Sequence, residues 1–236
     1  DEITNRIKKS GINAEEIRID EGCSRINIKL KTVDGTEING KGPTILNEHI
    51  EKLYEKLDNL KEGDILVLAG SIPSAVPETI YSDIMKHLQG RGVKVVVDAT
   101  GNLLVNVLKY NPFLVKPNNH ELGEIFGVEL NTRESVIPYA KKLVEMGAEN
   151  AVVSMAGDGA VFVSSNGDVY KKEAPKGTLV NGVGAGDSLV AGFIAGYLEK
   201  ADLLYAFKIG ISAGSASAFS DHLATKEEIE KIMNMI

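Results

Sequence analysis

The stretch NGVGAGDSLVAGFIAGYL, residues 181–198, joins a glycine-rich turn directly to a helix. Gly182, Gly184 and Gly186 alternate in the turn, so three of its positions have no Cβ to obstruct an approaching ligand. Apolar residues then recur at the spacing of one helical face. Free backbone N–H groups and the positive end of the helix dipole meet at such a junction, so the stretch predicts an anion-binding site.

Asp187 lies in this turn and allows two interpretations. Asp is favoured at the N-cap, and a glycine-rich helix start with a capping Asp is common. A carboxylate beside an anion site can also take a proton from a hydroxyl group while the site holds the phosphoryl group that the hydroxyl attacks. The turn is neither a Walker loop nor a GxGxxG motif, since no GK[ST] follows and its glycines have a different spacing. The turn alone leaves both interpretations open.

Upstream of the turn, short apolar segments alternate with amphipathic helical segments. We expect strands at 65–69, 93–98, 113–116, 151–154 and 160–164. We expect helices at 44–60, 77–89, 133–146, 187–199 and 202–219, before a short C-terminal helix. Strands without polar alternation are typical of a parallel sheet that helices cover on both faces. The chain is therefore predicted to be an α/β protein with a mostly parallel sheet.

The N-terminal part follows a different pattern. A short strand is expected at 16–19, and in SRINIKLK, residues 24–31, apolar and polar residues alternate as in a half-exposed strand. Asp34-Gly35 is a strong hairpin signal, and residues 36–39 supply the return strand. A hairpin with one solvated face does not belong in a buried sheet. We therefore interpret residues 16–41 as an inserted lid.

The composition excludes several classes of protein. A chain of 236 residues with 43% hydrophobic and 25% charged residues is ordinary for a globular protein. One cysteine, Cys23, rules out an internal disulfide framework and a Cys/His zinc motif, so a reducing, cytoplasmic setting is expected. No apolar run is long enough for a bilayer, and the net charge of −7 argues against nucleic acid as the main partner, because phosphate binding needs clustered positive charge.

The motif Gly184-Ala185-Gly186-Asp187 resembles the signature of the ribokinase-like carbohydrate kinases. This resemblance implies a three-layer α/β/α sandwich with a small β-strand lid. It also implies that Asp187 is the catalytic base and that the amides around it stabilise the transferred phosphoryl group. Asn181 belongs to the implied nucleotide site but departs from the family, in which many members carry Asp near a monovalent-cation site. A potassium requirement is therefore left open.

A second motif concerns a metal ion. In KPNNHEL, residues 116–122, Asn118 and Glu121 have the spacing of a helix capping box. They also resemble the family's N-x-x-E motif, which organises Mg²⁺ and the nucleotide phosphates largely through water. A hard cation that keeps its waters needs only one or two such ligands.

Two further segments resemble nucleotide-binding parts of the family. SMAGDGAVF, residues 154–162, has the turn glycines of a strand–turn–strand pattern, and it resembles a loop that contacts the nucleotide. Small residues in the helix at 208–219 favour close packing, and in relatives this helix forms one wall of the adenine pocket. The contacts that the resemblance implies are Ser154, Gly157, Gly159, Gly214 and Ser217, with Ala156 where the family usually has glycine.

The lid indicates the substrate. SRINIKL and GTEINGKGP, residues 24–30 and 35–43, resemble the 1-phosphofructokinase and tagatose-6-phosphate kinase branch of the family. In that branch an arginine of the lid pairs with the phosphate that the sugar already carries, a use suited to a guanidinium. Arg25 and Lys41 are the lid cations here, and Ser71 lies in a GSIP segment that resembles one facing the substrate. Basic residues on a strand also keep a sheet edge soluble, so residue type alone decides nothing.

The resemblance implies ATP-dependent phosphorylation of a phosphorylated ketohexose, with fructose 1-phosphate to fructose 1,6-bisphosphate as the favoured reaction. Tagatose-6-phosphate kinase is the alternative within the branch. A non-catalytic module that binds nucleotide or sugar phosphate is the alternative from another class. Family members begin with a strand carrying a substrate-binding Asp and a GGxxxN motif, which are missing here, so we expect one ribokinase-like domain over residues 1–236 without its N-terminal part. Lids of the family often clasp a second subunit, which implies a homodimer through the lid.

Overall fold

The computed structural model describes residues 2–29 and 37–236. The chain divides into two compact units, the first comprising residues 1–62 and 71–80 and the second residues 63–70 and 81–236. The lid expected at 16–41 belongs to the first unit.

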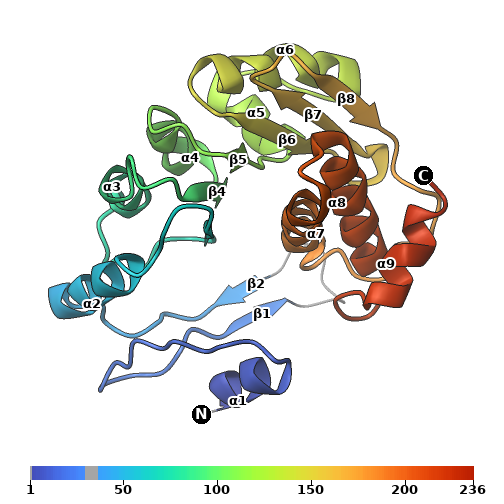
Figure 1. Cartoon of the computed structure of the whole chain (residues 1–236). Coiled ribbons are helices and arrows are strands. Elements are labelled where there is room, and N and C mark those ends of the chain that lie inside the picture. The colour runs from blue at the N-terminus through green and yellow to red at the C-terminus, as the bar shows by residue number, and fades with distance from the viewer. Residues whose placement is uncertain (1, 30–36) are drawn as a thin grey trace. The chain divides into compact units, whose positions relative to one another are not determined.

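The second unit contains a six-stranded sheet in the order β3-β4-β5-β6-β7-β8 (Figure 1). Its strands are β3 (Ile65–Ala69), β4 (Lys94–Asp98), β5 (Leu114–Val115), β6 (Asn150–Ser154), β7 (Ala160–Ser164) and β8 (Val169–Lys172). Strands β3 to β6 pair in parallel, and β7 and β8 are added antiparallel. The expected strands and the mostly parallel sheet are thus confirmed, while β8 was not predicted.

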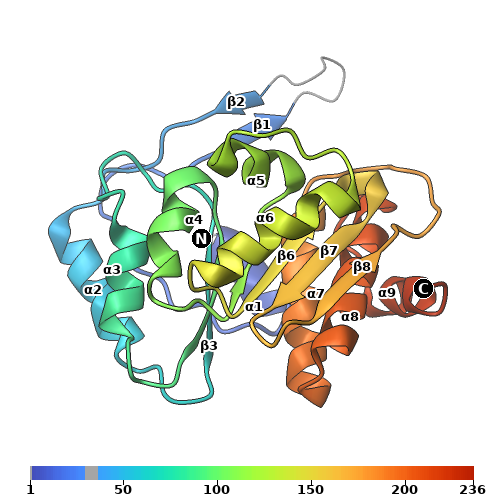
Figure 2. The same ribbon diagram turned by 90° about the horizontal axis from the view of Figure 1, so that it is seen from above.

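Helices cover both faces of this sheet (Figure 2). One face carries α3 (Ile80–His87), α4 (Gly101–Leu108), α5 (Asn119–Phe126) and α6 (Arg133–Glu145). The other carries α7 (Ala185–Lys200) and α8 (Leu203–Ala218), and α9 (Lys226–Met233) packs against α8. This arrangement confirms the three-layer α/β/α sandwich.

The core explains why α7 lies where it does. Alternate side chains of a strand point to opposite faces of its sheet, and Phe162 of β7 points toward α7 and α8. Its ring lies 5.9 Å from that of Phe193 in α7 and 5.7 Å from that of Phe207 in α8, centroid to centroid. All three rings are fully buried. A Cβ on Gly192 would lie 2.7 Å from Cβ of Ala213, so glycine lets α7 and α8 pack closely. These contacts hold α7 against the sheet.

The first unit contains α1 (Glu2–Lys9), α2 (Asn47–Leu57) and an antiparallel pair of strands, β1 (Asn27–Lys29) and β2 (Glu37–Asn39), in which Ile28 lies opposite Ile38. The hairpin strands are confirmed, whereas Asp34-Gly35 lies outside the described residues.

The strand expected at 16–19 is wrong, because these residues form no strand. A hydrogen bond from the Thr4 side chain holds the carboxylate of Glu16 instead and lowers its pKa. Within the described part of the chain, no helix has both the length and the apolar character needed to cross a bilayer.

Candidate active site

The glycine-rich turn begins α7, as its sequence predicts. The helix starts at Ala185, and its N-cap is Gly184, whose φ of +79° lies in the left-handed region that favours glycine. Asp187 lies in the first turn and is exposed, so its interpretation as the N-cap residue is wrong. Because Gly184 offers no side chain as a cap, the N–H groups of the first turn have no capping side chain as acceptor, and that of Ala185 donates to the carbonyl of Gly182 at 3.3 Å.

A buried ammonium group lies beside this turn. Lys116 follows β5 and is 6% exposed. Its Nζ lies 3.3 Å from the position that a Cβ on Gly186 would occupy, and 3.1 Å from Oδ1 of Asp98 at the end of β4. Since β4 and β5 are parallel neighbours, both side chains emerge at the same edge of the sheet. The ammonium and the positive end of the helix both attract an anion, and the neighbouring carboxylates of Asp98 and Asp187 offset part of this attraction.

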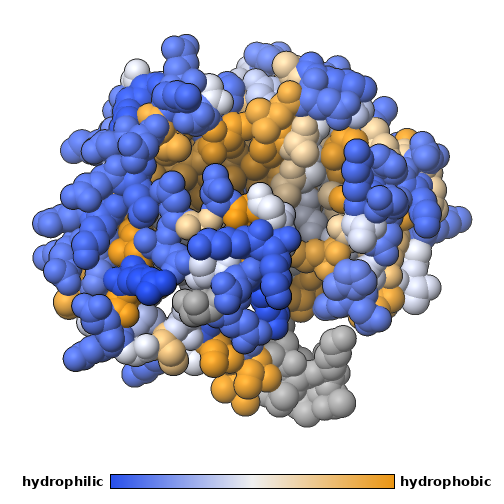
Figure 3. All heavy atoms as spheres, turned by 60° about the horizontal axis from the view of Figure 1, so that its bottom comes forward, coloured by the Kyte–Doolittle hydropathy of each residue, from blue (hydrophilic) through white to orange (hydrophobic). Residues whose placement is uncertain are grey.

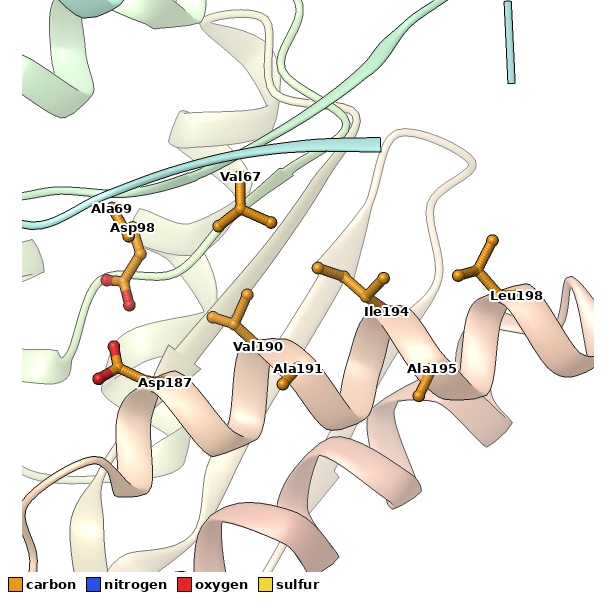
Figure 4. A pocket seen from close by; sticks show the side chains of 9 residues that line it. All are labelled: Val67, Ala69, Asp98, Asp187, Val190, Ala191, Ile194, Ala195 and Leu198. Carbon is orange, nitrogen blue, oxygen red and sulfur yellow. The ribbon is translucent and has the colours of Figure 1, made fainter. Parts of the chain in front are cut away.

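Asp98 also faces Asp187 (Figure 4). Burial raises the pKa of Asp98, and the negative charges of Asp187 and Glu121 raise it further, while the charge and the hydrogen bond of Lys116 oppose this rise. Asp98 and Asp187 line a cavity of about 470 Å³. The rest of its lining is apolar and comes from β3 and α7: Val67, Ala69, Val190, Ala191, Ile194, Ala195 and Leu198.

Asn118 and Glu121 form the capping box that their spacing predicts. Oδ1 of Asn118 accepts a hydrogen bond from the N–H of Glu121 at 2.9 Å, and Oε2 of Glu121 accepts one from the N–H of Asn118 at 2.8 Å. The described residues contain no group of three His, Cys, Asp or Glu side chains close enough to hold a metal ion directly. However, the carboxylates of Glu121 and Asp187 both act electrostatically on Asp98, which Lys116 partly compensates. Such a site fits a hard cation bound largely through water.

Two of the expected nucleotide residues lie on the carboxyl side of β6. Ser154 pairs with Asn118 in an isolated parallel bridge, and its N–H donates to the carbonyl of Pro117. Gly157 is exposed in the short turn that follows. The structure therefore brings Ser154 next to the Asn118–Glu121 box.

Ala156 begins that turn, and Gly159 ends it. Gly159 is buried with a φ of +90°, and a Cβ there would collide with the carbonyl of Lys172. The backbone conformation and this close approach therefore explain why position 159 is a glycine. Ala156 has a φ of +47°, a conformation that glycine would adopt without strain.

Asn181 stabilises the glycine-rich turn from within. Its Oδ1 accepts from the N–H of Val183 at 3.1 Å, and its Nδ2 donates to the carbonyl of Asp221 at 3.3 Å. A Cβ on Gly214 would lie 3.0 Å from the carbonyl oxygen of Ala185, so this glycine lets α8 pack against the start of α7.

Ser217 is 2% exposed, and its hydroxyl group bonds to Ser188 and to the N–H of Ala224. Direct contacts of Asn181, Gly214 and Ser217 with a nucleotide stay predictions.

In the first unit, two of the expected substrate residues lie together. Nη1 of Arg25 donates to Oγ of Ser71 at 3.0 Å, across 46 positions of sequence, and both residues are exposed. Lys41 is exposed directly after β2. The hydrogen bond supports the expectation that Arg25 and Ser71 act on one ligand.

Lys116 is the residue that the sequence analysis missed. It is the first residue of KPNNHEL, the motif that contains Asn118 and Glu121. The available signal was its position, because a lysine that ends an apolar strand of a parallel sheet points to the edge where ligands bind.

The site combines amides at a helix start with a carboxylate in the first turn and a buried ammonium beside them. These groups lie at the carboxyl edge of a parallel sheet. Such an arrangement is typical of an enzyme that transfers a phosphoryl group. The profile of the pfkB family carbohydrate kinases matches residues 1–229. The chain belongs to this family.

Similar proteins of known name support this family assignment. A 1-phosphofructokinase of Bacillus subtilis is 50% identical over 213 residues, which cover 90% of this chain and 70% of that protein. A D-tagatose-1-phosphate kinase of Bacillus licheniformis is 30% identical over 217 residues, covering 92% and 71%. A crystal structure of a candidate phosphofructokinase from Staphylococcus aureus superposes with a TM-score of 0.88 at 39% identity, covering 98% of this chain and 75% of that one.

Replacing Lys116 by methionine should raise the pKa of Asp98 further, because the ammonium opposes the effect of burial. The folded-state pKa of Asp98 lies above the unfolded value of about 3.9. Asp98 therefore stabilises the folded state below that value, and this contribution is lost as the pH rises through the folded-state pKa. In K116M the loss should occur at a higher pH. Titration of the carboxyl carbon by NMR measures the pKa directly.

Lys171→Met is the matched control for this measurement. Lys171 pairs with Glu134 at the surface and is not among the main groups that shift the pKa of Asp98. A pKa of Asp98 that is the same in K116M and K171M would contradict the ion pair as the controlling interaction.

Proposed function

We propose that the protein transfers the γ-phosphoryl group of ATP to fructose 1-phosphate and forms fructose 1,6-bisphosphate. The observation that carries this proposal is the position of Asp187 and the Lys116 ammonium at the uncapped start of α7. The 50% identity to a 1-phosphofructokinase supports the choice of substrate.

Asp187 acts as the general base in this proposal. Its exposed carboxylate accepts the proton of the attacking hydroxyl group as the oxygen bonds to phosphorus. The N–H groups of Gly184, Ala185 and Gly186, with the helix dipole, stabilise the charge that develops on the transferred group. Lys116 adds a full positive charge at the same place, and Asp98 holds its ammonium in position through the 3.1 Å ion pair.

Mg²⁺ fits the acidic side of the site. Asn118 and Glu121 would hold it largely through water, and it would neutralise charge on the nucleotide phosphates. Ser154, Gly157, Gly159 and Asn181 form the nucleotide side, as the family resemblance implies.

Arg25 and Ser71 hold the phosphate already present on the sugar. A guanidinium forms paired, charge-assisted hydrogen bonds with a phosphate, and the hydroxyl of Ser71 lies within hydrogen-bond distance of the same guanidinium. Lys41 supplies a second positive charge.

Steady-state kinetics on three substrates test the choice of sugar. We expect kcat/KM for fructose 1-phosphate to exceed the values for tagatose 1-phosphate and tagatose 6-phosphate at least about tenfold, the effect of roughly one well-placed hydrogen bond. A higher value for either tagatose phosphate would replace the proposed substrate. Nucleotide binding without turnover of any sugar phosphate would support the binding-module alternative.

Arg25→Gln provides the control within this experiment. Losing a charge-assisted contact should raise the KM for fructose 1-phosphate about tenfold or more, while the KM for ATP stays unchanged. An equal rise in both KM values would show that the substitution acts through folding and not through the sugar phosphate.

Asp187→Asn should retain nucleotide binding and lose turnover. The amide has nearly the same shape as the carboxylate but accepts no proton, so kcat should fall by about a thousandfold, within the range known for general bases. Calorimetry with ADP measures binding and a coupled assay measures kcat. Turnover close to that of the unmodified protein would refute the role of Asp187.

We further propose that the lid pairs with the lid of a second copy of the chain. Ile26, Ile28 and Ile38 are 67%, 48% and 55% exposed, and Ile28 and Ile38 lie directly opposite each other in the hairpin. Figure 3 shows hydrophobic side chains exposed together on the surface of the lid. An apolar sheet face of this kind is self-complementary when two copies meet about a two-fold axis.

Ile28→Glu should therefore shift the protein from dimer to monomer, because it places a charge in the apolar contact. Asn27→Glu is the control, since the neighbouring side chain points to the opposite face of the strand. Sedimentation velocity gives both masses. An unmodified protein that sediments as a monomer would exclude this dimer.

A further inference from the structure

One buried hydroxyl group joins three separate parts of the second unit. Ser217 lies in the last turn of α8 and is 2% exposed. Its Oγ donates to Oγ of Ser188, the residue that follows Asp187, at 2.8 Å. The same oxygen accepts from the N–H of Ala224 at 3.0 Å, in the segment between α8 and α9. Ser217 thus links the helix turn that carries Asp187 to a segment that has no regular structure of its own.

That segment lies against the glycine-rich turn. A Cβ on Gly184 would lie 2.6 Å from Cδ2 of Leu223, so the leucine occupies the space that a side chain on Gly184 would take. Leu223 is 61% exposed and has little packing of its own to hold it there. The hydrogen bond to Ala224, its neighbour, supplies a fixed point.

The glycine-rich turn is hydrogen-bonded to the same end of α8. The N–H groups of Val180 and Asn181 both donate to the carbonyl of Ala218, at 2.9 and 3.1 Å. The side chain of Asn181 donates to the carbonyl of Asp221. The turn that offers its amides to the phosphoryl group is therefore held by residues 217–224, and Ser217 provides the buried side-chain bonds in this set.

We propose that Ser217 is a positioning residue for phosphoryl transfer, which ties residues 221–224 to the first turn of α7 and so fixes the amides and the carboxylate of that turn. The proposal rests on the function proposed above. It assigns Ser217 an effect through Ser188 and Ala224 and needs no contact between Ser217 and the nucleotide. Preorganised groups of this kind act mainly on the transition state, so the effect belongs in kcat.

Ser212 offers a matched control on the same helix. It is also buried, and its hydroxyl donates to the carbonyl of Lys208 within α8 and contacts Sδ of Met233 in α9. Ser212→Ala and Ser217→Ala remove the same atom from the same helix, but only the second touches the glycine-rich turn.

Hydrogen exchange at the amide of Ala224 tests directly the hydrogen bond that links the segment between α8 and α9 to Ser217. In Ser217→Ala the amide of Ala224 should exchange about tenfold faster or more, because it loses its buried acceptor. In Ser212→Ala, and in Ser188→Ala, which keeps the bond between Ser217 and Ala224, this amide should exchange as in the unmodified protein. An amide of Ala224 that is equally protected in all four proteins would overturn the tie.

Kinetics test the effect on the reaction. Ser217→Ala should lower kcat about tenfold with less than a twofold change in the KM for fructose 1-phosphate, since a preorganised group is lost and the sugar-phosphate contacts remain. Ser188→Ala should lower kcat to a smaller extent, and Ser212→Ala should leave it unchanged. Equal kcat values for S217A and S212A, with equal losses of melting temperature, would show a merely structural role and overturn the proposal.

The two proposals fail in different ways. If the unmodified protein does not phosphorylate fructose 1-phosphate, the proposed function fails, and exchange at the amide of Ala224 still decides whether Ser217 holds the segment between α8 and α9. If the unmodified protein is active and S217A matches S212A, only the role of Ser217 fails.

Discussion

The buried ion pair of Lys116 and Asp98 is the constraint on which the candidate site depends. An ammonium that is 6% exposed is costly to bury unless a carboxylate compensates it, and the 3.1 Å contact to Asp98 supplies that carboxylate. The pair requires β4 and β5 to be adjacent and parallel, so that both side chains emerge at one edge. A Cβ at position 186 would lie 3.3 Å from the Nζ of Lys116, a tight contact that Gly186 avoids.

The start of α7 is open because its N-cap residue, Gly184, has no side chain to cap it. A helix N-terminus that is already capped by a side chain has less to offer to an anion, and here the cap is Gly184. The aromatic contacts of Phe162 with α7 and α8 hold the helix in place from its buried side, far from the cap. Stability and ligand binding are thus assigned to different parts of α7, which lets the first turn remain unsatisfied without loosening the helix.

Most of the fold was predictable because buried strands and helix faces require apolar residues at regular positions in the sequence. The strands at 65–69, 151–154 and 160–164 are short apolar runs, and the structure has β3, β6 and β7 at almost these bounds. β8 has no such apolar run, since Val169, Tyr170 and Lys172 are only half-buried and Lys171 is exposed. Residues 16–19 form no strand, and the side chain of Thr4 forms a hydrogen bond with the carboxylate of Glu16, a contact that a pattern of alternation does not show.

The candidate site was predictable only where its residues are neighbours in sequence. Gly184 to Asp187, and Asn118 with Glu121, are local motifs whose geometry follows from a helix start. The contact of Lys116 with both Asp98 and Gly186 joins three segments that only the folded sheet brings together, and no local pattern encodes it. The same holds for the link of Ser217 to Ser188 and Ala224.

The charges of the site also bear on how a nucleotide would enter it. Asp98, Asp187 and Glu121 contribute three negative charges when ionised, and Lys116 contributes one positive charge, which leaves the site net negative before any ligand binds. A free triphosphate adds more negative charge and would be repelled by the carboxylates at this range. A triphosphate that arrives with a divalent cation brings its own compensation, and the cation then meets carboxylates that the protein has left only partly neutralised. Under the proposed function, the excess of carboxylates beside the anion-binding turn would suit a metal–nucleotide complex, and a second buried lysine in place of a carboxylate would weaken binding of the cation.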